Sequence, residues 1–465
     1  MLHVDQAIDP VRWLVYLLAG GPLLAWLFFT RQEALRLLGL LVALIIIQDN
    51  FAGRRWVWAF SIAPSIILVY VALLSQVFQR RLPQLGVFIP LWISLLFFAA
   101  VGAISGSIGT GLLANNVDRY QIVFLEGLLF FLFGLVAVRR DTDLLAFLRV
   151  QATWVGLVVA LIHFFTIATG FRFRNALDIE QSFYYGGVLS NPNALAAYYV
   201  MLIPVALSML VRQRLSPWTR LVTSISLVAM IGSLVLTGGR SGLLFTVGMC
   251  VVALVQSRMG FARAIAAIGA AGVVAYLGFE LMISLVPDTW MQIFGIAQQE
   301  GLETDRFLLA KLYGQMMLEH PFGIGLSAPN FEKLMAKYGI VHAVNSHNLY
   351  LDMGLQTGIP GLLTFLAMVG IVMLRNRRAY ALSEDPAQRE ALFYLFLMLL
   401  GYLSNGYFQP IFSVYPKLGN LFWLLAGLSL AASQRVFAAR RAASAEHPFA
   451  TRSASFDGPP HAHRV

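Results

Sequence analysis

The sequence predicts an all-α, polytopic membrane protein. Of its 465 residues, 58% are hydrophobic and only 12% are charged, and the mean hydropathy is +0.73. A soluble protein of this length needs a charged surface, whereas a transmembrane helix needs about 20 predominantly apolar residues. Apolar runs close to that length recur from one end of the chain to the other. We therefore expect about 12–14 transmembrane helices and one large periplasmic loop that contains short helices.

The expected spans follow one another in the order of these apolar runs. They lie near 12–29, 35–49, 56–78, 85–103, 121–138, 144–168, 193–211, 219–237, 241–257, 263–285, 355–374, 390–404 and 418–432. The chain then divides into transmembrane helices over 1–285, a large external loop over 286–354, transmembrane helices over 355–432 and a tail over 433–465. From Ala442 the tail is rich in Ala, Ser, Pro and His without periodicity, so we expect it to be disordered.

Arginine placement predicts the orientation of the spans. Arginines cluster in alternate short loops, at positions 80, 81, 139, 140, 212, 214, 220, 258, 263, 375, 377, 378, 435, 440 and 441. Cytoplasmic loops carry an excess of basic residues, so these loops and the tail are expected in the cytoplasm, and 169–192 and 286–354 outside it. Arg54 and Arg55 do not fit this scheme, which leaves the topology before residue 56 open. The net charge of +10 suits anionic lipid head groups better than nucleic acid.

A histidine marks the place where the large loop returns to the membrane, in the segment 345–362. His347 is predicted at the start of a short helix that Gly358 ends, and Pro360 is placed to begin the next helix. The positive end of a helix dipole disfavours the imidazolium form, and an ordinary pKa near ~6.5 already leaves the ring mostly neutral. His347 is therefore a candidate general base. The alternative is a polar residue flanking a helix cap at the membrane boundary.

Two arginines are candidates for binding an anion. Arg240 stands among three glycines in Thr-Gly-Gly-Arg-Ser-Gly, on the side where few arginines are expected, although an arginine at a helix end can also snorkel. Arg306 opens an amphipathic surface helix predicted over Thr304–His320. A cation is unfavourable at a helix start, so a compensating anion is implied there. Asp305 and Glu303 are one source of it.

The second external loop, 169–192, adds further candidates. Arg172 and Arg174 form either a phosphate-binding pair or contacts with lipid head groups, and the sequence favours neither. Asn193 ends a Ser-Asn-Pro-Asn turn that leads into a helix.

Several common sites are missing from the sequence. It contains no Walker A pattern, no glycine-rich nucleotide loop, no zinc-type His or Cys pair and no Asp-x-Asp pattern, so no cofactor or metal is expected. A neutral base beside arginines at a bilayer edge suits a substrate with a lipid tail and a diphosphate. The base can activate a hydroxyl while the arginines stabilise the leaving diphosphate.

Four motifs resemble those of the O-antigen ligase and polymerase superfamily of bacterial surface-glycan enzymes. They are His347-Asn348 with Gly358-x-x-Gly361, Thr237-Gly-Gly-Arg240 with Leu244, Asp305-Arg306 followed by His320-Pro-Phe-Gly-Ile-Gly-Leu326, and Ser190-Asn-Pro-Asn-Ala-Leu-Ala196. The resemblance covers roughly 170–375. It departs from the family at Gly239, where Ser or Thr is frequent, and at Ala310, where Leu is expected four residues after Arg306.

The resemblance implies an inverting, metal-independent glycosyl transfer from an undecaprenyl-diphosphate-linked glycan, at the periplasmic face of the bacterial inner membrane. His347 would be the base, and Arg240 and Arg306 would hold the diphosphate. Substrate contacts are expected from Arg172, Arg174, Asn193 and Asn348.

The acceptor remains open. A ligase acting on lipid A-core is preferred over a polymerase that extends another lipid-linked repeat, and over a protein O-glycosyltransferase. A transporter for the same lipid-linked glycan would explain the spans and the arginines. It would not explain a large external loop that carries the histidine, and the chain has no evident matching halves with interrupted helices.

Overall fold

The computed structural model describes most of the helical bundle. The described residues are 55–57, 60–62, 69, 71, 73, 86–107, 120–138, 143–169, 189, 191–256, 269, 302–325, 336, 346–409 and 416–446. Within them, six helices are long and apolar enough to cross a membrane, and two shorter apolar helices accompany them. The predicted all-α, polytopic class is confirmed.

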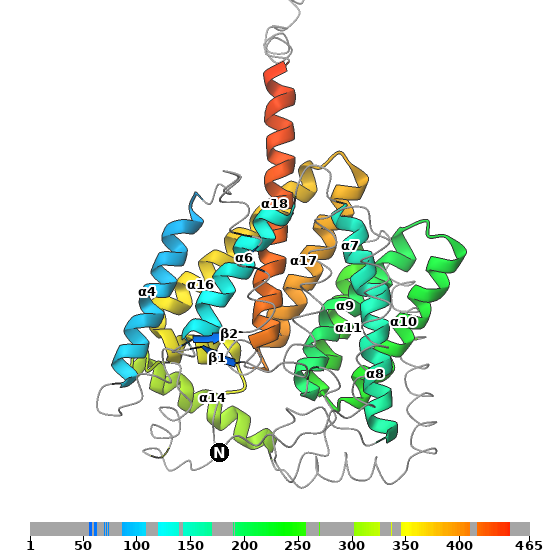
Figure 1. Ribbon diagram of the computed structural model, residues 1–465. Helices are drawn as coiled ribbons and strands as arrows, with labels where there is room; N and C mark the ends of the chain where they lie inside the picture. Colours follow the sequence, from blue (N-terminus) through cyan, green and yellow to red (C-terminus); the bar gives the residue numbers. More distant parts are fainter. Residues whose placement is uncertain are drawn as a thin grey trace, which may run out of the picture.

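The helices run alternately up and down in one bundle, and α14 (Leu302–Glu319) lies across one end of it (Figure 1). The bundle consists of α4 (Phe88–Ser107), the π-helix η1 (Gln121–Leu125) with α6 (Glu126–Ala137), α7 (Leu144–Val150), the π-helix η2 (Gln151–Val155) with α8 (Gly156–Thr169), α9 (Pro192–Arg212), α10 (Pro217–Leu236), α11 (Arg240–Gln256), α16 (Leu349–Leu382), α17 (Pro386–Gly406) and α18 (Pro416–Glu446). The end that α14 crosses is called the α14 end below.

Asx and Ser caps define where several helices start. Asn191, Ser216 and Asp385 cap α9, α10 and α17, and the side-chain oxygen of each accepts a hydrogen bond from a backbone N–H in the first turn. Each is followed by a proline, whose missing N–H costs nothing at the first helical position. These local sequence features define where the three helices start.

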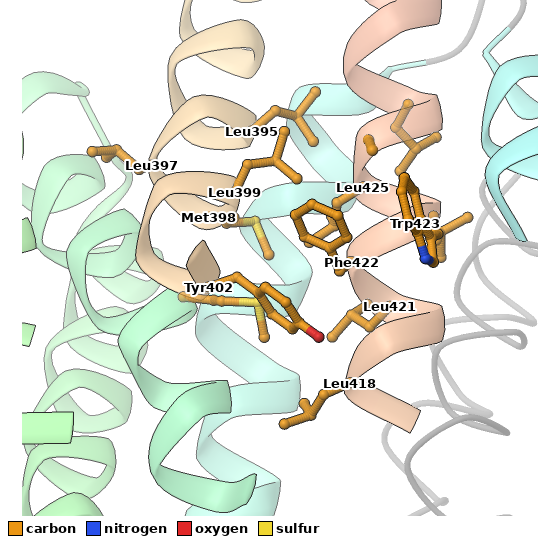
Figure 2. Packing of buried hydrophobic residues seen from close by; sticks show 14 of the residues in the cluster. Leu395, Leu397, Met398, Leu399, Tyr402, Leu418, Leu421, Phe422, Trp423 and Leu425 are labelled. Carbon is orange, nitrogen blue, oxygen red and sulfur yellow. The ribbon is translucent and has the colours of Figure 1, made fainter. Parts of the chain in front are cut away.

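The core lies where α17 and α18 pack among α4, α6 and α16. Aromatic rings dominate it: Trp423 lies 4.7 Å from Trp92 between ring centroids, and Tyr402 stacks on Phe422 at the same distance. Figure 2 shows how the α17 and α18 side chains interdigitate there. The backbones of α6 and α18 approach closely, because a Cβ on Gly134 would lie only 2.5 Å from the Leu424 carbonyl oxygen. Small residues allow such close helix contacts in membranes.

Buried polar side chains link helices within the bundle. Asn420 donates to Glu126 across the α6–α18 interface (3.1 Å), and both side chains are buried. His163 in α8 lies 2.6 Å from the Ser233 hydroxyl, which donates to Tyr199 (2.8 Å). His163 is thus a buried, hydrogen-bonded side chain, as expected for a histidine within a span.

Helix α16 is broken at Gly358. This residue has φ 75° and ψ 171°, outside the helical region, and Pro360 lies in the first turn of the second part. The sequence expectation that Gly358 ends one helix and Pro360 opens the next is confirmed.

The turn that follows α14 is tied to this break by the backbone. Gly323 and Gly325 take positive φ values of 87° and 85°. Three hydrogen bonds join the turn to α16: Ile324 N to Leu355 O (2.8 Å), Gly325 N to Gln356 O (3.2 Å) and Ile359 N to Pro321 O (2.9 Å). The break leaves carbonyls and an N–H without helical partners, and the turn supplies those partners.

Two sequence expectations need correction. Residues Arg55–Val57 and Phe60–Ile62 form an antiparallel hairpin where the span 56–78 was expected to begin. The aromatic and β-branched run Arg-Trp-Val-Trp-Ala-Phe-Ser-Ile favours strands.

Helix α18 continues to Glu446, so the expected disordered tail over 433–465 is wrong up to that residue. Its alanine-rich sequence favours helix without needing a buried face. The rest of the tail, and the expected spans 12–29, 35–49 and 263–285, lie outside the described residues or almost so.

We predict that Gly358→Ala destabilises the protein. A Cβ there would collide with the Pro321 carbonyl oxygen and with Phe322, and the positive φ costs a non-glycine residue about 1–3 kcal/mol by itself. The thermal unfolding midpoint in detergent should fall. Gly370→Ala is the matched control, because Gly370 lies in the same helix with no atom within 4 Å of an added Cβ. Equal midpoints for the two variants would contradict the role given to the break.

Candidate active site

His347 stands immediately before the cap of α16, in an unusual backbone conformation. Its φ is 52°, and it is the only non-glycine residue with a positive φ in the described part of the chain. Histidine tolerates this region better than most residues, but the conformation persists only where the surroundings impose it. Such residues cluster at functional sites. The predicted position beside a helix start is confirmed.

Asn348 is the N-cap of α16. Its side-chain oxygen accepts hydrogen bonds from the N–H groups of Tyr350 (2.9 Å) and Leu351 (3.1 Å). This is the ordinary task of an asparagine cap. A contact between Asn348 and substrate stays a prediction beside this structural role.

Arg240 is the first residue of α11 and follows a two-glycine turn. Thr237 ends α10, and its hydroxyl accepts from the Gly239 N–H (3.2 Å), while Gly238 has φ 66°. Only glycine takes such values at little cost, so the sequence Thr-Gly-Gly-Arg produces a tight reversal between two helices. The reversal places Arg240 at the α14 end (Figure 1).

The start of α9 packs directly against this reversal. Added Cβ atoms on Gly239 and Gly242 would lie 3.2 and 2.9 Å from the Ala196 Cβ. Two motifs that the sequence analysis singled out separately, Ser190–Ala196 and Thr237–Arg240, therefore meet in space. Asn193 is the second residue of α9 and is half-buried beside this contact.

The end of α17 connects the His347 segment to α11. The Leu349 side chain packs on Gly406, where an added Cβ would lie 2.8 Å from it. Tyr350 donates to the Leu403 carbonyl (2.8 Å). Phe408, two residues beyond Gly406, contacts Phe245 of α11 with ring centroids 5.8 Å apart. The starts of α16 and α11 thus both pack against the end of α17.

Helix α14, which contains Arg306, docks on the first part of α16. Tyr313 and Met316 are fully buried and form a small cluster with Ile324 and Leu355. Arg306 precedes Tyr313 by seven residues, or about two helical turns, so the two positions lie on one side of the α14 axis. The helix predicted over Thr304–His320 is confirmed as α14.

The three proposed catalytic positions therefore belong to elements that meet at one end of the bundle. His347 and Arg240 stand at the starts of α16 and α11, and Arg306 lies in α14, which crosses that end (Figure 1). Arg172 and Arg174 lie outside the described residues.

A buried carboxylate that was not predicted from the sequence lies close to the histidine. Asp352 is only 2% exposed, and its Oδ1 accepts hydrogen bonds from the Ser346 N–H (3.0 Å) and hydroxyl (2.5 Å). Burial and then the negative charge of Asp352 raise the pKa of the Tyr313 phenol in α14. An acidic residue in an otherwise apolar run five positions after His347 was the available signal.

The part of the chain that carries these residues matches a known protein family. The family model described as O-Antigen ligase matches residues 225–366. Residues 225–366 are thus similar to the O-antigen ligase family, and they are called the matched domain below. The domain includes Arg240, Arg306 and His347, and it begins within α10 and ends within α16. A search of curated proteins found no match.

The domain agrees with the resemblance stated from the motifs. It points to a glycan-processing enzyme of the O-antigen ligase or polymerase kind, a family that acts on lipid-linked glycans. The backbone links between residues 321–325 and 355–359 both fall inside it, so the domain's glycine-rich turn and its late helix form one unit.

We predict that Asn348→Ala loosens the first turn of α16, whereas Asn348→Ser does not. Loss of an asparagine cap costs about 1 kcal/mol, which corresponds to roughly fivefold faster local opening. Hydrogen–deuterium exchange at Tyr350 and Leu351 measures it directly. If Asn348→Ala leaves their exchange unchanged, the cap does not hold this turn.

Proposed function

We propose that the protein is a glycosyltransferase that moves a glycan from an undecaprenyl-diphosphate carrier to a hydroxyl acceptor, as an O-antigen ligase acting on lipid A-core. The observation that carries this proposal is the left-handed His347 at the start of α16, inside the matched domain. The starts of α16 and α11 give this end two positive helix dipole ends, which favour an anionic substrate group.

The proposed reaction is a single displacement at the sugar. His347 takes the proton of the acceptor hydroxyl as its oxygen forms the bond to the anomeric carbon. The bond from that carbon to the diphosphate oxygen breaks, and the electron pair leaves with the diphosphate. Attack opposite the leaving group inverts the anomeric configuration. The products are the glycosylated acceptor and undecaprenyl diphosphate, with the proton on His347 until it passes to solvent.

The arginines are proposed to bind the leaving group. A guanidinium binds phosphate oxygens through two parallel hydrogen bonds and keeps its charge at all relevant pH values. Arg240 and Arg306 would stabilise the negative charge that develops on the diphosphate, so the reaction needs no metal. Arg172, Arg174, Asn193 and Asn348 are proposed substrate contacts.

The site is proposed to face the periplasm, with the protein in the bacterial inner membrane. The arginine-rich segments support this orientation, because Arg212, Arg220, Arg375 and Arg440 belong to helix ends opposite the α14 end (Figure 1). Basic residues favour the cytoplasmic side. A donor that is already activated as a diphosphate needs no ATP, which the periplasm does not supply.

A ligase, a polymerase and a transporter differ in what receives the glycan, so the experiment identifies the acceptor. Purified protein is given a labelled lipid-linked glycan together with either lipid A-core or a second lipid-linked glycan. Label on lipid A-core supports the ligase. Lengthened lipid-linked chains would instead establish a polymerase. Movement of the glycan across a vesicle membrane without covalent transfer would establish a transporter.

We predict that His347→Ala abolishes transfer, with a fall in kcat of about 100-fold or more, because a positioned base contributes 10²–10⁴-fold. His320→Ala is the control, since His320 lies at the same end and the hydrogen bonds that form its turn use only its backbone. Equal expression and unfolding midpoints exclude misfolding. Wild-type turnover by His347→Ala would rule out the base role.

Arg240→Lys is predicted to lose most of its activity although the charge is retained, because lysine cannot bind phosphate through two parallel hydrogen bonds as arginine does. Arg220→Lys, at an exposed position of α10, should behave as wild type. Steady-state transfer rates report the difference. Full activity in Arg240→Lys would favour an arginine that only snorkels at a helix end.

A further inference from the structure

We propose that Asp352 is the positioning residue for His347, and that it acts through the Ser346 hydroxyl. This inference deepens the proposed function and rests on it for its catalytic consequence. Asp352 lies in the first turn of α16 and is 2% exposed. Its carboxylate points back out of the helix and accepts from both the N–H and the hydroxyl of Ser346.

The Ser346 hydroxyl joins both residues that flank the histidine. Its oxygen lies 2.5 Å from Asp352 Oδ1, 2.8 Å from the Asn348 carbonyl oxygen and 3.0 Å from the Asn348 nitrogen. A hydroxyl has one proton, and the charged, closer acceptor takes it. The same oxygen then accepts from the Asn348 N–H. Ser346 and Asn348 are thereby connected around His347, and Asp352 anchors the connection.

This closed arrangement accounts for the left-handed backbone of His347. A non-glycine residue at φ 52° needs its neighbours fixed on both sides, and here both are fixed by one hydroxyl. Asn348 is held a second time as the cap of α16. The imidazole consequently leaves the backbone in one defined direction. A base must be held within hydrogen-bond reach of the proton it removes.

Ordinary capping does not explain Asp352. In a capping box the acidic side chain reaches back to the N–H of the cap residue, which here is Asn348. Asp352 instead reaches beyond the cap, to a residue outside the helix on the far side of the histidine. The position is electrostatically suitable, because a carboxylate in the first turn is stabilised by the helix dipole.

Asp352 also couples the histidine segment to α14. The charge of Asp352 acts on Tyr313, which is buried in the cluster that docks α14 on α16. Arg306 belongs to the same helix. The charge of Asp352 is therefore felt at the contact between α14 and α16.

The test compares the variants Asp352→Asn, Asp352→Ala, Ser346→Ala and Ser346→Thr. Asparagine keeps an oxygen at the acceptor position and threonine keeps the hydroxyl. We expect Asp352→Ala and Ser346→Ala to lower kcat by about 10-fold or more, while KM for the lipid-linked glycan changes less than about twofold, because a small displacement of a catalytic group costs rate more than binding. Asp352→Asn and Ser346→Thr should recover most of the loss. Asp385→Asn, which keeps the cap of α17 at the opposite end, is the control.

A second readout does not depend on activity. Hydrogen–deuterium exchange at the Ser346 and Asn348 amides should accelerate in both alanine variants and return towards wild type in Ser346→Thr. Wild-type kcat and exchange in Ser346→Ala would overturn the proposal, as would a loss confined to KM. Ser346→Ala and Ser346→Thr keep it testable if Asp352→Ala fails to fold.

The outcomes separate this inference from the proposed function. Turnover by His347→Ala refutes the base role, whatever the Asp352 variants do. An inactive His347→Ala together with fully active Asp352→Ala and Ser346→Ala refutes only the positioning role.

Discussion

The backbone pairing between the turn after α14 and the break in α16 is the constraint on which the α14 end depends. Without the break at Gly358, residues 355–359 would satisfy their own hydrogen bonds and offer nothing to the turn. With it, three backbone hydrogen bonds fix the turn at residues 321–325 to α16. Side chains cannot replace this pairing, because a Cβ on Gly323 would lie 2.6 Å from the Gln356 carbonyl oxygen. Gly323 and Gly358 are therefore required for the close approach of the two backbones as well as for their positive φ values.

Several helices begin at the α14 end. α9, α11 and α16 all begin there, so the positive ends of three helix dipoles converge, which favours an anionic group. Glycine and asparagine at these starts shape the backbone around the proposed catalytic residues, His347 and Arg240. The proposed site therefore lies at one end of a bundle of apolar helices.

The sequence predicted the elements well and their mutual contacts poorly. Apolar runs are local signals, and they placed most described helices to within a few residues. Gly358 and Pro360 are also local signals, and they correctly predicted the break in α16. Contacts between distant segments, such as Ala196 with Gly239, depend on packing that no local pattern encodes. Asp352 was missed because its partner Ser346 is polar but ordinary, and only the fold reveals that the pair encloses a histidine. The hairpin at residues 55–62 was missed because an aromatic run is as hydrophobic as a span.

Helix α18 is longer than a membrane is thick. Its 31 residues extend over about 46 Å, whereas the hydrocarbon core measures about 30 Å. It stands well clear of the other helices at the end opposite α14 (Figure 1). Arg440 and Arg441 lie near its C-terminal end and are exposed. A helix of this length that crosses the bilayer must therefore extend beyond the hydrocarbon core on at least one side.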